Sequence, residues 1–377
     1  AQYKSEVAQT LLAPAATVRA RVSDSGESDN QTTKSEPQLS DSAESVMQTA
    51  KSAFQLSDSP ESDTLVARRA MVDLTGGFGV DFSYLARGFS QATYVERQRH
   101  LCDLAEHNMA ALGLDQARIV CGDGVEYLRQ MGPVDFIYLD PARRDEHGSR
   151  TYAIEDCTPN VFELRDLLLS KSQYTLVKLS PMLDWRKAVA DFDGTVREVH
   201  IVATGNECKE LLLVLGQQVH EEPSAPRVFC VNDNQRIDYD SAAYTQGLRI
   251  GGKPLPEAKN YLYEPNASIM KAGCFDLVEE RFGVTQVGPS SHLFVSATPV
   301  ADFPGRGFAI EAIGGMNKKD IKRLLNGTKQ ANIAVRNFPL TAPQLRKKLK
   351  LADGGPVYLF GTTMQGCDHV LLRTSKI

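Results

Sequence analysis

Strand-like and helix-like segments alternate along the chain between Ala70 and Gly216. Short apolar runs such as Met71–Thr75, Ala92–Glu96 and Val134–Asp140 are each followed by a stretch with helical character. This alternation is typical of a mostly parallel sheet covered by helices. In such a sheet a ligand lies across the carboxyl ends of the strands. The residues that end each predicted strand are therefore the first candidates for a site.

The first predicted strand runs directly into a glycine-rich loop, in the stretch VDLTGGFGVD at Val72–Asp81. Glycine permits positive φ and close approach of the backbone, so the expected occupant of such a loop is a ligand. A nicotinamide dinucleotide would require a third glycine where Phe82 stands, and the Gly-Lys-Ser/Thr ending of a P-loop is absent. Asp81 near the helix start would also repel a pyrophosphate. The sequence therefore predicts a ligand without phosphate.

Acidic residues end four predicted strands in register with this loop, namely Asp73, Glu96, Asp123 and Asp140. A nucleoside with a cationic tail fits them. Glu96 can accept hydrogen bonds from both ribose hydroxyls, and Asp123 can accept one from an adenine amino group. Asp73 and the loop would meet an amino acid portion. A helix cap or a solvated carboxylate explains each acid equally well alone, but all four together favour a ligand site.

These stretches resemble the motifs of class I S-adenosylmethionine-dependent methyltransferases. VDLTGGFGVD is similar to the first motif, VE at 95–96 to the second, GD at 122–123 to the third and LDPAR at 139–143 to the fourth. The resemblance covers 65–216 and implies a Rossmann-like, seven-stranded α/β sheet with an antiparallel last strand. It also implies S-adenosyl-L-methionine as the cofactor. The cofactor-binding residues that it implies are Asp73, Thr75, Gly76, Gly77, Phe78, Gly79, Glu96, Asp123, Gly124 and Asp140.

A narrower resemblance extends to the rest of the chain. DPARRD, KLSPMLD, NECKELL, YLYEPNASIMKAG, FPGR and VRNFPL resemble bacterial methyltransferases with a THUMP-like C-terminal domain. THUMP domains accompany RNA-modifying enzymes, so the resemblance implies a base in tRNA or rRNA as the methyl acceptor. After Gln217 strands dominate, with two clear helices at 317–326 and 341–351, which predicts an α+β domain. We expect a polar, partly helical segment at 1–63, a methyltransferase domain at 64–217 and a THUMP-like domain at 218–377.

The resemblance makes Asp140, Pro141 and Arg143 the catalytic residues. Positioning an acceptor in line with an activated methyl group can supply about 7–11 kcal/mol. Amino-methylating relatives carry D/N-P-P-Y/F here, and Arg143 replaces the aromatic residue, although a guanidinium can also stack on a base or hold a phosphate. DPAR is also similar to the DPPR of uridine C5-methyltransferases, whose nucleophilic cysteine is absent from Leu179-Ser180-Pro181. Exocyclic or ring nitrogen is therefore favoured over carbon.

The N-terminal 62 residues are polar and carry a repeated unit. SDSGES, SDSAES and SDSPES recur every 17 residues from Ser23, and each contains Asp-Ser-x-Glu. This pattern can cap a helix N-terminus, so we expect helices within 40–70. An acidic linker or a disordered tail is the alternative, and residues 1–39 fit either description.

Charge is unevenly distributed along the chain. The net charge is −5, yet 317–350 holds 10 basic and 1 acidic side chains, hence +9. This segment predicts an acidic partner, and RNA is the one that the resemblance implies. Two solvated helix faces are the alternative interpretation.

Other classes of function receive less support. The seven cysteines form no C-x-x-C pair and the seven histidines show no ligand spacing, so no metal site is expected. The absence of a long apolar run or a signal-like N-terminus predicts a cytoplasmic protein without membrane partners. Three functions stay open: RNA methylation, methylation of a protein or small molecule, and a non-catalytic nucleoside- or RNA-binding module.

Overall fold

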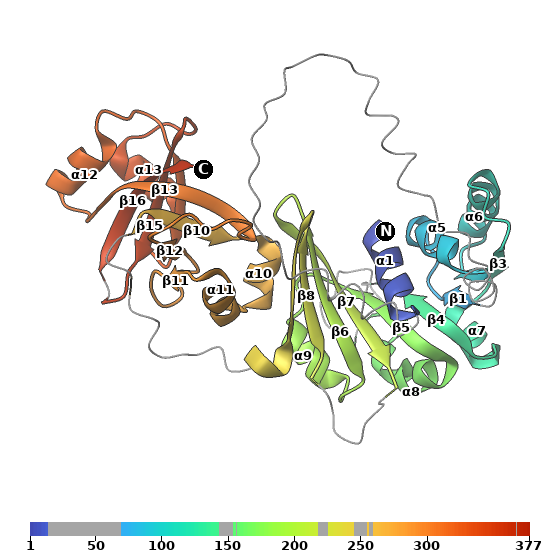
Figure 1. Ribbon diagram of the computed structural model, residues 1–377. Coiled ribbons are helices and arrows are strands. Elements are labelled where there is room, and N and C mark those ends of the chain that lie inside the picture. Colours follow the sequence, from blue (N-terminus) through green and yellow to red (C-terminus); the bar gives the residue numbers. More distant parts are fainter. Residues whose placement is uncertain are drawn as a thin grey trace, which may run out of the picture. The chain divides into compact units, whose positions relative to one another are not determined.

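The computed structural model describes residues 1–13, 69–142, 154–155, 157–217, 225–244, 255, 259–366 and 368–377 (Figure 1). They belong to two compact units, 1–142 with 158–177 and 143–157 with 178–377. The helices predicted within 40–70 lie outside the described residues, since only Arg69 and Ala70 of that range are described. The repeats and Arg143 also lie outside the described residues.

The first unit is built on parallel strands in the order β3-β2-β1-β4-β5. Their bounds are β1 Ala70–Asp73, β2 Gln91–Glu96, β3 Ala117–Cys121, β4 Val134–Leu139 and β5 Ser172–Leu179. The central strands β1 and β4 are short apolar runs with consecutive buried residues, because helices can cover both faces of a parallel sheet. β1, β2 and β4 start within one residue of the strands predicted at Met71–Thr75, Ala92–Glu96 and Val134–Asp140.

Helices connect these strands, as the alternation predicts. They are α5 Val80–Leu85, α6 Arg99–Ala111, α7 Gly124–Gln130 and α8 Val161–Lys171, with a short 3₁₀ turn at Ala86–Gly88. An additional helix, α1 Gln2–Leu11, lies beside α5 (Figure 1). The hydroxyl of Ser5 on α1 donates to the carbonyl of Tyr84 at 3.0 Å. Residues 2–11 are thus helical, within the part of the chain, 1–39, for which the sequence left the structure open.

The second unit begins with α9 Trp185–Asp191 and two hairpins. β6 Val196–Thr204 and β7 Glu207–Gly216 are antiparallel, as the sequence predicts for the last strands of the methyltransferase fold. Their two-residue turn has positive φ at Gly205 and Asn206, the conformation that tight hairpins favour. β8 Arg227–Asn232 pairs in parallel with β6 and antiparallel with β9 Gln235–Asp240. The sheet therefore continues past residue 217 through the pairing of β6 with β8. The domain boundary predicted at 217/218 stays a prediction.

A second sheet forms the C-terminal part, in the order β11-β12-β10-β13-β16-β15-β14. Its strands are β10 Tyr261–Pro265, β11 Thr285–Gln286, β12 Phe294–Ser296, β13 Gly305–Gly314, β14 Asn332–Arg336, β15 Val357–Thr363 and β16 His369–Lys376. Neighbouring residues of one strand face opposite sides. Leu359 packs with the helices α12 Lys318–Leu325 and α13 Ala342–Leu349, whereas Phe360 packs in a second core cluster with Leu262 and Leu293.

The two helices expected at 317–326 and 341–351 are present as α12 and α13, within the order β13-α12-β14-α13-β15-β16. The expectation of only two clear helices after 217 is wrong, because α10 Ala267–Ala272 and α11 Phe275–Phe282 precede them. α10 has only six residues, too few for apolar periodicity to show, whereas α11 is as long as α12 and α13. The Asn266 side chain accepts hydrogen bonds at the start of α10, and Gly273 ends it with positive φ. These capping residues were the available signal.

Candidate functional site

The glycine loop follows β1 and is held by backbone hydrogen bonds. The amide of Gly76 donates to the carbonyl of Val95 on β2 at 2.9 Å, and the amide of Gly79 donates to Gly76 at 2.9 Å. Gly77 and Gly79 have φ of 55° and 74°, a region that side chains with a Cβ rarely adopt. The loop therefore has one defined conformation at the carboxyl end of the sheet.

Only part of this glycine pattern is explained by space for a ligand. A Cβ on Gly76 would overlap the ring of buried Tyr94, and one on Gly79 would come within 2.9 Å of the Met109 methyl group. A Cβ on Gly77 would meet only the carbonyl of Thr75, at 3.7 Å. At Gly76 and Gly79 the protein itself therefore excludes a side chain, and only beside Gly77 would a Cβ find open space.

Glu96 lies at the end of β2 and braces this loop. Its Oε2 accepts a hydrogen bond from the amide of Gly77 at 3.0 Å, and its Oε1 accepts one from the amide of Gln98 at 2.9 Å. Carboxylate oxygens have two lone pairs each, so each oxygen can accept a second hydrogen bond. Glu96, predicted to bind the ribose of the cofactor, thus lies against the glycine loop that is predicted to bind the same cofactor.

Asp123 follows β3 and caps α7. Its Oδ1 accepts hydrogen bonds from the amides of Val125 and Glu126 at 2.8 and 3.1 Å. Asp123 therefore has the helix-capping role that could by itself explain an acid at this position. Both capping hydrogen bonds use Oδ1. A Cβ on the next residue, Gly124, would overlap the carbonyl of Leu74. This glycine brings the start of α7 against the loop after β1.

Asp140 follows β4 and is tied to the same loop through its backbone. Its amide donates to the Thr75 hydroxyl at 2.7 Å. Pro141 is buried, and the Ala142 amide donates to the carbonyl of Thr158 at 2.8 Å. The chain is thus fixed on both sides of Asp140, whose own side chain is part exposed.

Asp73 is the buried acid of the site. Its Oδ1 accepts hydrogen bonds from the amide and hydroxyl of Thr75, at 2.9 and 3.4 Å. Burial raises the pKa of Asp73 to about 8, the amide of Thr75 opposes that rise, and the charges of Asp81 and Asp140 add to it. Three carboxyl groups therefore converge at this end of the sheet.

Two contacts at the site had no signal in the sequence. Lys4 on α1 is buried and donates to Asp81 at 3.1 Å, and the hydroxyl of Tyr138 donates to the same carboxylate at 2.6 Å. Lys4 and Asp81 are 77 positions apart in the chain, so local pattern cannot pair them. Phe78, predicted to contact the cofactor, is 77% exposed at the tip of the loop.

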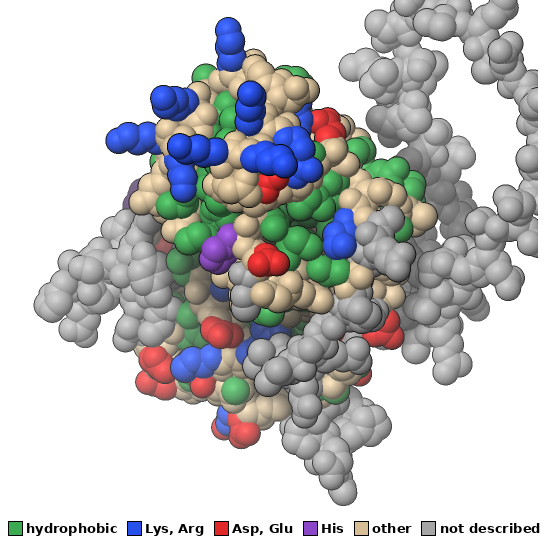
Figure 2. Space-filling model, turned by 90° about the vertical axis from the view of Figure 1, so that its left-hand side faces the viewer, with side chains coloured by type: hydrophobic (Ala, Val, Ile, Leu, Met, Phe, Trp, Pro, Cys, Tyr) green, Lys and Arg blue, Asp and Glu red, His purple; other side chains and the backbone are tan. Residues whose placement is uncertain are grey.

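The basic segment 317–350 divides into two groups of residues. Arg336, Arg323 and Arg346 hydrogen-bond to protein acceptors. The six lysines on or beside α12 and α13 are exposed: Lys318, Lys319, Lys322, Lys347, Lys348 and Lys350. Figure 2 shows Lys and Arg side chains gathered on this part of the surface. The predicted positive surface is therefore present and consists mainly of lysines.

Within the described residues, no group of three or more potential ligands is arranged to hold a metal ion. No helix there is long and apolar enough to span a membrane.

Comparison with known proteins places this fold and site in a class. Residues 261–304 match the model of a ferredoxin-like domain, and 305–376 match a model described as THUMP domain-like. The crystal structure of a proposed methyltransferase from Porphyromonas gingivalis W83 is 35% identical, with a TM-score of 0.73 over 82% of this chain and 77% of that one. A search of curated proteins gives no match.

Two further solved structures align with less of the chain. An S-adenosylmethionine-dependent methyltransferase from Agrobacterium tumefaciens is 18% identical, with a TM-score of 0.31 over 40% of this chain and 57% of that one. An rRNA methylase from Streptococcus thermophilus is 14% identical, with a TM-score of 0.30 over 44% of this chain and all of its own.

The fold and the first comparison define a Rossmann-like methyltransferase with ferredoxin-like and THUMP-like parts at its C-terminal end. The chain belongs to the same family as the Porphyromonas gingivalis protein. The family and the fold class expected from sequence are thereby confirmed.

Proposed function

We propose that this protein is an S-adenosylmethionine-dependent methyltransferase that modifies a base in RNA. The observation that carries the proposal is the group of carboxylates at the carboxyl ends of neighbouring parallel strands, tied to one glycine loop. Glu96 bonds to Gly77, Asp140 to Thr75, and Asp73 also to Thr75. In parallel sheets of this kind the ligand lies at that end.

The local charge suits a cationic ligand. Asp73, Asp81 and Asp140 lie close enough for the last two to raise the pKa of the first, and Lys4 pairs with Asp81. A ligand with a sulfonium and an ammonium group would favour the ionised form of Asp73. The Gly77 position, where a Cβ would meet only one backbone atom within 4 Å, leaves space for it.

Each residue has a separate role in holding the cofactor. We assign the ribose hydroxyls to Glu96, the adenine amino group to Asp123, and the amino acid portion to Asp73 with Gly76, Gly77 and Thr75. Phe78 and Gly79 complete the loop, and Gly124 places the start of α7 beside it. S-adenosyl-L-methionine supplies an activated methyl group, so the chain's task is to align the acceptor.

We assign the acceptor to Asp140, Pro141 and Arg143. The backbone bonds from Asp140 to Thr75 and from Ala142 to Thr158 fix this segment, which favours precise positioning of a target group. Asp140 can accept a hydrogen bond from an amino group of a base. Methylation at C5 of uridine needs a nucleophilic thiolate, and Leu179-Ser180-Pro181, where that cysteine would stand, has none; Cys157 is buried and burial raises the pKa of Cys208. Nitrogen is therefore the favoured acceptor atom.

RNA is favoured over a protein or small molecule by the six exposed lysines of α12 and α13 and by the match of 305–376 to a THUMP-like model. Phosphate groups bind such surfaces with strong salt dependence.

The proposal is tested by incubating the protein with methyl-labelled S-adenosylmethionine and separate RNA and protein fractions from a bacterial strain that lacks it. Label in the RNA fraction, digested by nuclease and found on a nucleobase, is the expected result. An Asp140→Ala protein is the matched control. Label in the protein fraction alone would replace RNA with a protein acceptor.

A further inference from the structure

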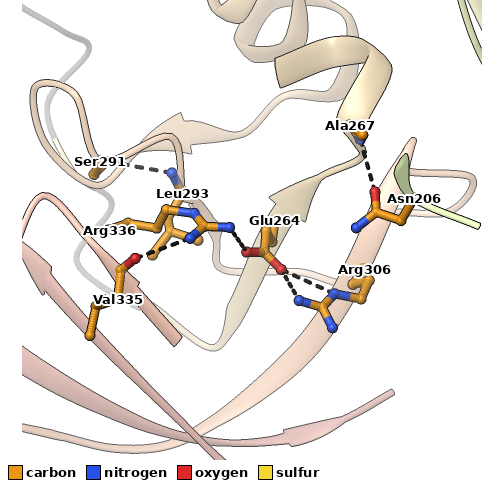
Figure 3. A network of polar contacts seen from close by, with 8 residues as sticks. All are labelled: Asn206, Glu264, Ala267, Ser291, Leu293, Arg306, Val335 and Arg336. Carbon is orange, nitrogen blue, oxygen red and sulfur yellow. Dashed lines mark hydrogen bonds and ion pairs between the residues drawn. The ribbon is translucent and has the colours of Figure 1, made fainter. Parts of the chain in front are cut away.

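A buried carboxylate in the C-terminal sheet is held between two arginines. Glu264, near the end of β10, is 3% exposed. It accepts hydrogen bonds from Arg306 Nε at 3.0 Å and from Arg306 Nη2, and another from Arg336 Nη2 at 2.7 Å (Figure 3). Arg306 stands directly opposite Glu264 in the pairing of β10 with β13, and Arg336 ends β14. We call these three residues the Glu264 cluster.

The Glu264 cluster carries a net positive charge. Two guanidinium groups are always charged, so one carboxylate leaves an excess of one positive charge. Both arginine side chains keep substantial solvent access, 46% for Arg306 and 39% for Arg336. The carboxylate therefore fixes the orientation of two arginine side chains that remain part exposed.

Some nitrogen atoms of this cluster and its surroundings have no hydrogen-bond partner among the described residues. Nε of Arg336 is buried without a hydrogen-bond partner, and Nη1 of Arg306 has none among the residues that the structure describes. Nδ1 of His292 is also buried and unpartnered. Burial lowers the pKa of His292, and the nearby charge of Arg336 lowers it further, so this ring is neutral near pH 7. An unmade hydrogen bond of a buried donor destabilises the protein, so an added acceptor is favoured here.

Arg373 in the same sheet shows what a structural arginine looks like. Its Nε donates to Glu311 at 2.7 Å, and its Nη1 donates to the carbonyls of Leu324 and Leu325 and to the Thr328 hydroxyl at 2.8–2.9 Å. Its side chain is only 18% exposed. The Glu264 cluster differs because its arginines are more exposed, and because one of them, Arg336, keeps a buried Nε without a hydrogen-bond partner.

We infer that the Glu264 cluster is a binding site for a phosphate group of an RNA backbone. Guanidinium edges match the oxygens of a phosphate and can donate two parallel hydrogen bonds to it. Glu264 serves as the orienting group, since it holds both arginines from behind. The inference rests on the proposed RNA substrate. It adds a fixed contact to the flexible lysine contacts of α12 and α13, which lie in the same THUMP-like segment as Arg306 and Arg336.

The test measures binding of a fluorescein-labelled 30-nucleotide hairpin RNA by anisotropy over a range of KCl concentrations. Arg306→Gln and Arg336→Gln should each weaken binding about tenfold, because each variant lacks one charge-assisted hydrogen bond. Each should also reduce the slope of log affinity against log salt by about 0.7 to 0.9. Arg227→Gln removes an exposed arginine paired with Asp238 and should change neither quantity.

A second variant separates the specific contact from folding and from net charge. In Glu264→Gln with Arg336→Gln, the buried carboxylate is removed together with its partner, and the net charge of the cluster equals that of the wild type. Weakened RNA binding in this folded protein supports the site. The inference alone fails if the wild type binds RNA and all these variants match it. If the wild type binds no RNA, the inference and the RNA proposal fail together.

A competition with inorganic phosphate completes the experiment. We expect millimolar inorganic phosphate to displace the hairpin no better than chloride at equal ionic strength, because one phosphate lacks the additional backbone contacts. Displacement at micromolar phosphate that depends on Arg336 would assign the cluster to a small free anion and overturn the RNA assignment.

Discussion

Two buried carboxylates, one in each unit of the chain, have opposite surroundings. Asp73 lies beside two other acids and a glycine loop, and burial raises its pKa to about 8. Glu264 lies between two arginines that remain part exposed. The first environment places two further carboxyl groups beside the acid and suits a cation, whereas the second has an excess of positive charge and suits an anion. The contrast indicates that the charges around a buried acid, more than the acid itself, show which kind of ligand a site suits.

Among the variants that test this comparison, Gly77→Val should have the largest effect, and we expect it to abolish cofactor binding. The backbone there has φ of 55°, and the new side chain would enter the space assigned to the ligand. Gly113→Val is the matched control, since Gly113 also has positive φ but a Cβ there would meet no atom within 4 Å. Calorimetry should show normal cofactor affinity for the control only. Normal binding by folded Gly77→Val would remove the loop from the cofactor site.

Asp140→Ala should reduce the turnover number by about 100-fold or more while leaving cofactor affinity within a few fold. This residue positions the acceptor, and misplacement of reacting groups by about 1 Å has costs of that size. The control is Asp135→Ala at the other end of β4, where the carboxylate accepts a hydrogen bond from the Ala70 amide at 2.7 Å. It should lower stability and spare turnover. Turnover of Asp140→Ala within about threefold of wild type would make Asp140 a structural residue.

The raised pKa of Asp73 predicts opposite pH dependences for stability and cofactor binding. Between pH 3.8 and about 8 the folded protein holds a proton on Asp73 that the unfolded chain releases. The free energy of unfolding should therefore fall as pH rises through this range, by up to about 1.4 kcal/mol per pH unit. Affinity for a cationic cofactor should rise over the same range, because the carboxylate becomes charged.

Urea unfolding and calorimetry between about pH 6 and 8 check this prediction. Asp73→Asn should remove both trends, whereas Asp115→Asn, at an exposed position, should keep them. Identical pH profiles for the wild type and Asp73→Asn would show that Asp73 does not titrate in this range.

The smallest effect should come from the lysines. Replacing Lys347, Lys348 and Lys350 with Gln should weaken RNA binding severalfold and flatten the salt slope by about 0.7 for each phosphate that these lysines bind, with cofactor affinity unchanged. Arg346 is left in place because it donates to the carbonyls of Ala331 and Ala352 at 3.0 and 2.8 Å. Lys187→Gln with Lys209→Gln, at two exposed ion pairs, is the control. An unchanged slope would remove α13 from the RNA surface.

The sequence predicts the parts of this molecule that depend on local pattern. Alternating apolar segments predict the parallel strands, and strand-terminal acids at Glu96, Asp123 and Asp140 predict which residues gather at the loop. It misses Lys4 because the partner, Asp81, is far along the chain. It gives no sign that the ring of Tyr94 excludes a side chain at Gly76, because that is a tertiary contact.

The Glu264 cluster shows the same limit. Glu264, Arg306 and Arg336 lie in three separate motifs, and the pairing of β10 with β13 that brings two of them together is visible only in the fold. Their chemistry follows from charge and burial, which no local pattern contains. The structure adds to the candidate residues chiefly where strands distant in sequence meet.

The pairing of β8 with β6 has a consequence for aggregation of shortened forms of the protein. A chain ended at Gln217 would leave the edge of β6 without its neighbour, and such an open edge is a template for self-association. A chain ended at Tyr244 would keep β8 and would have β9 as its edge strand. The outward residues of β9, Arg236, Asp238 and Asp240, are charged. Charged edge strands resist pairing with another copy. We therefore expect the longer fragment to elute as a monomer in size-exclusion chromatography and the shorter one to aggregate.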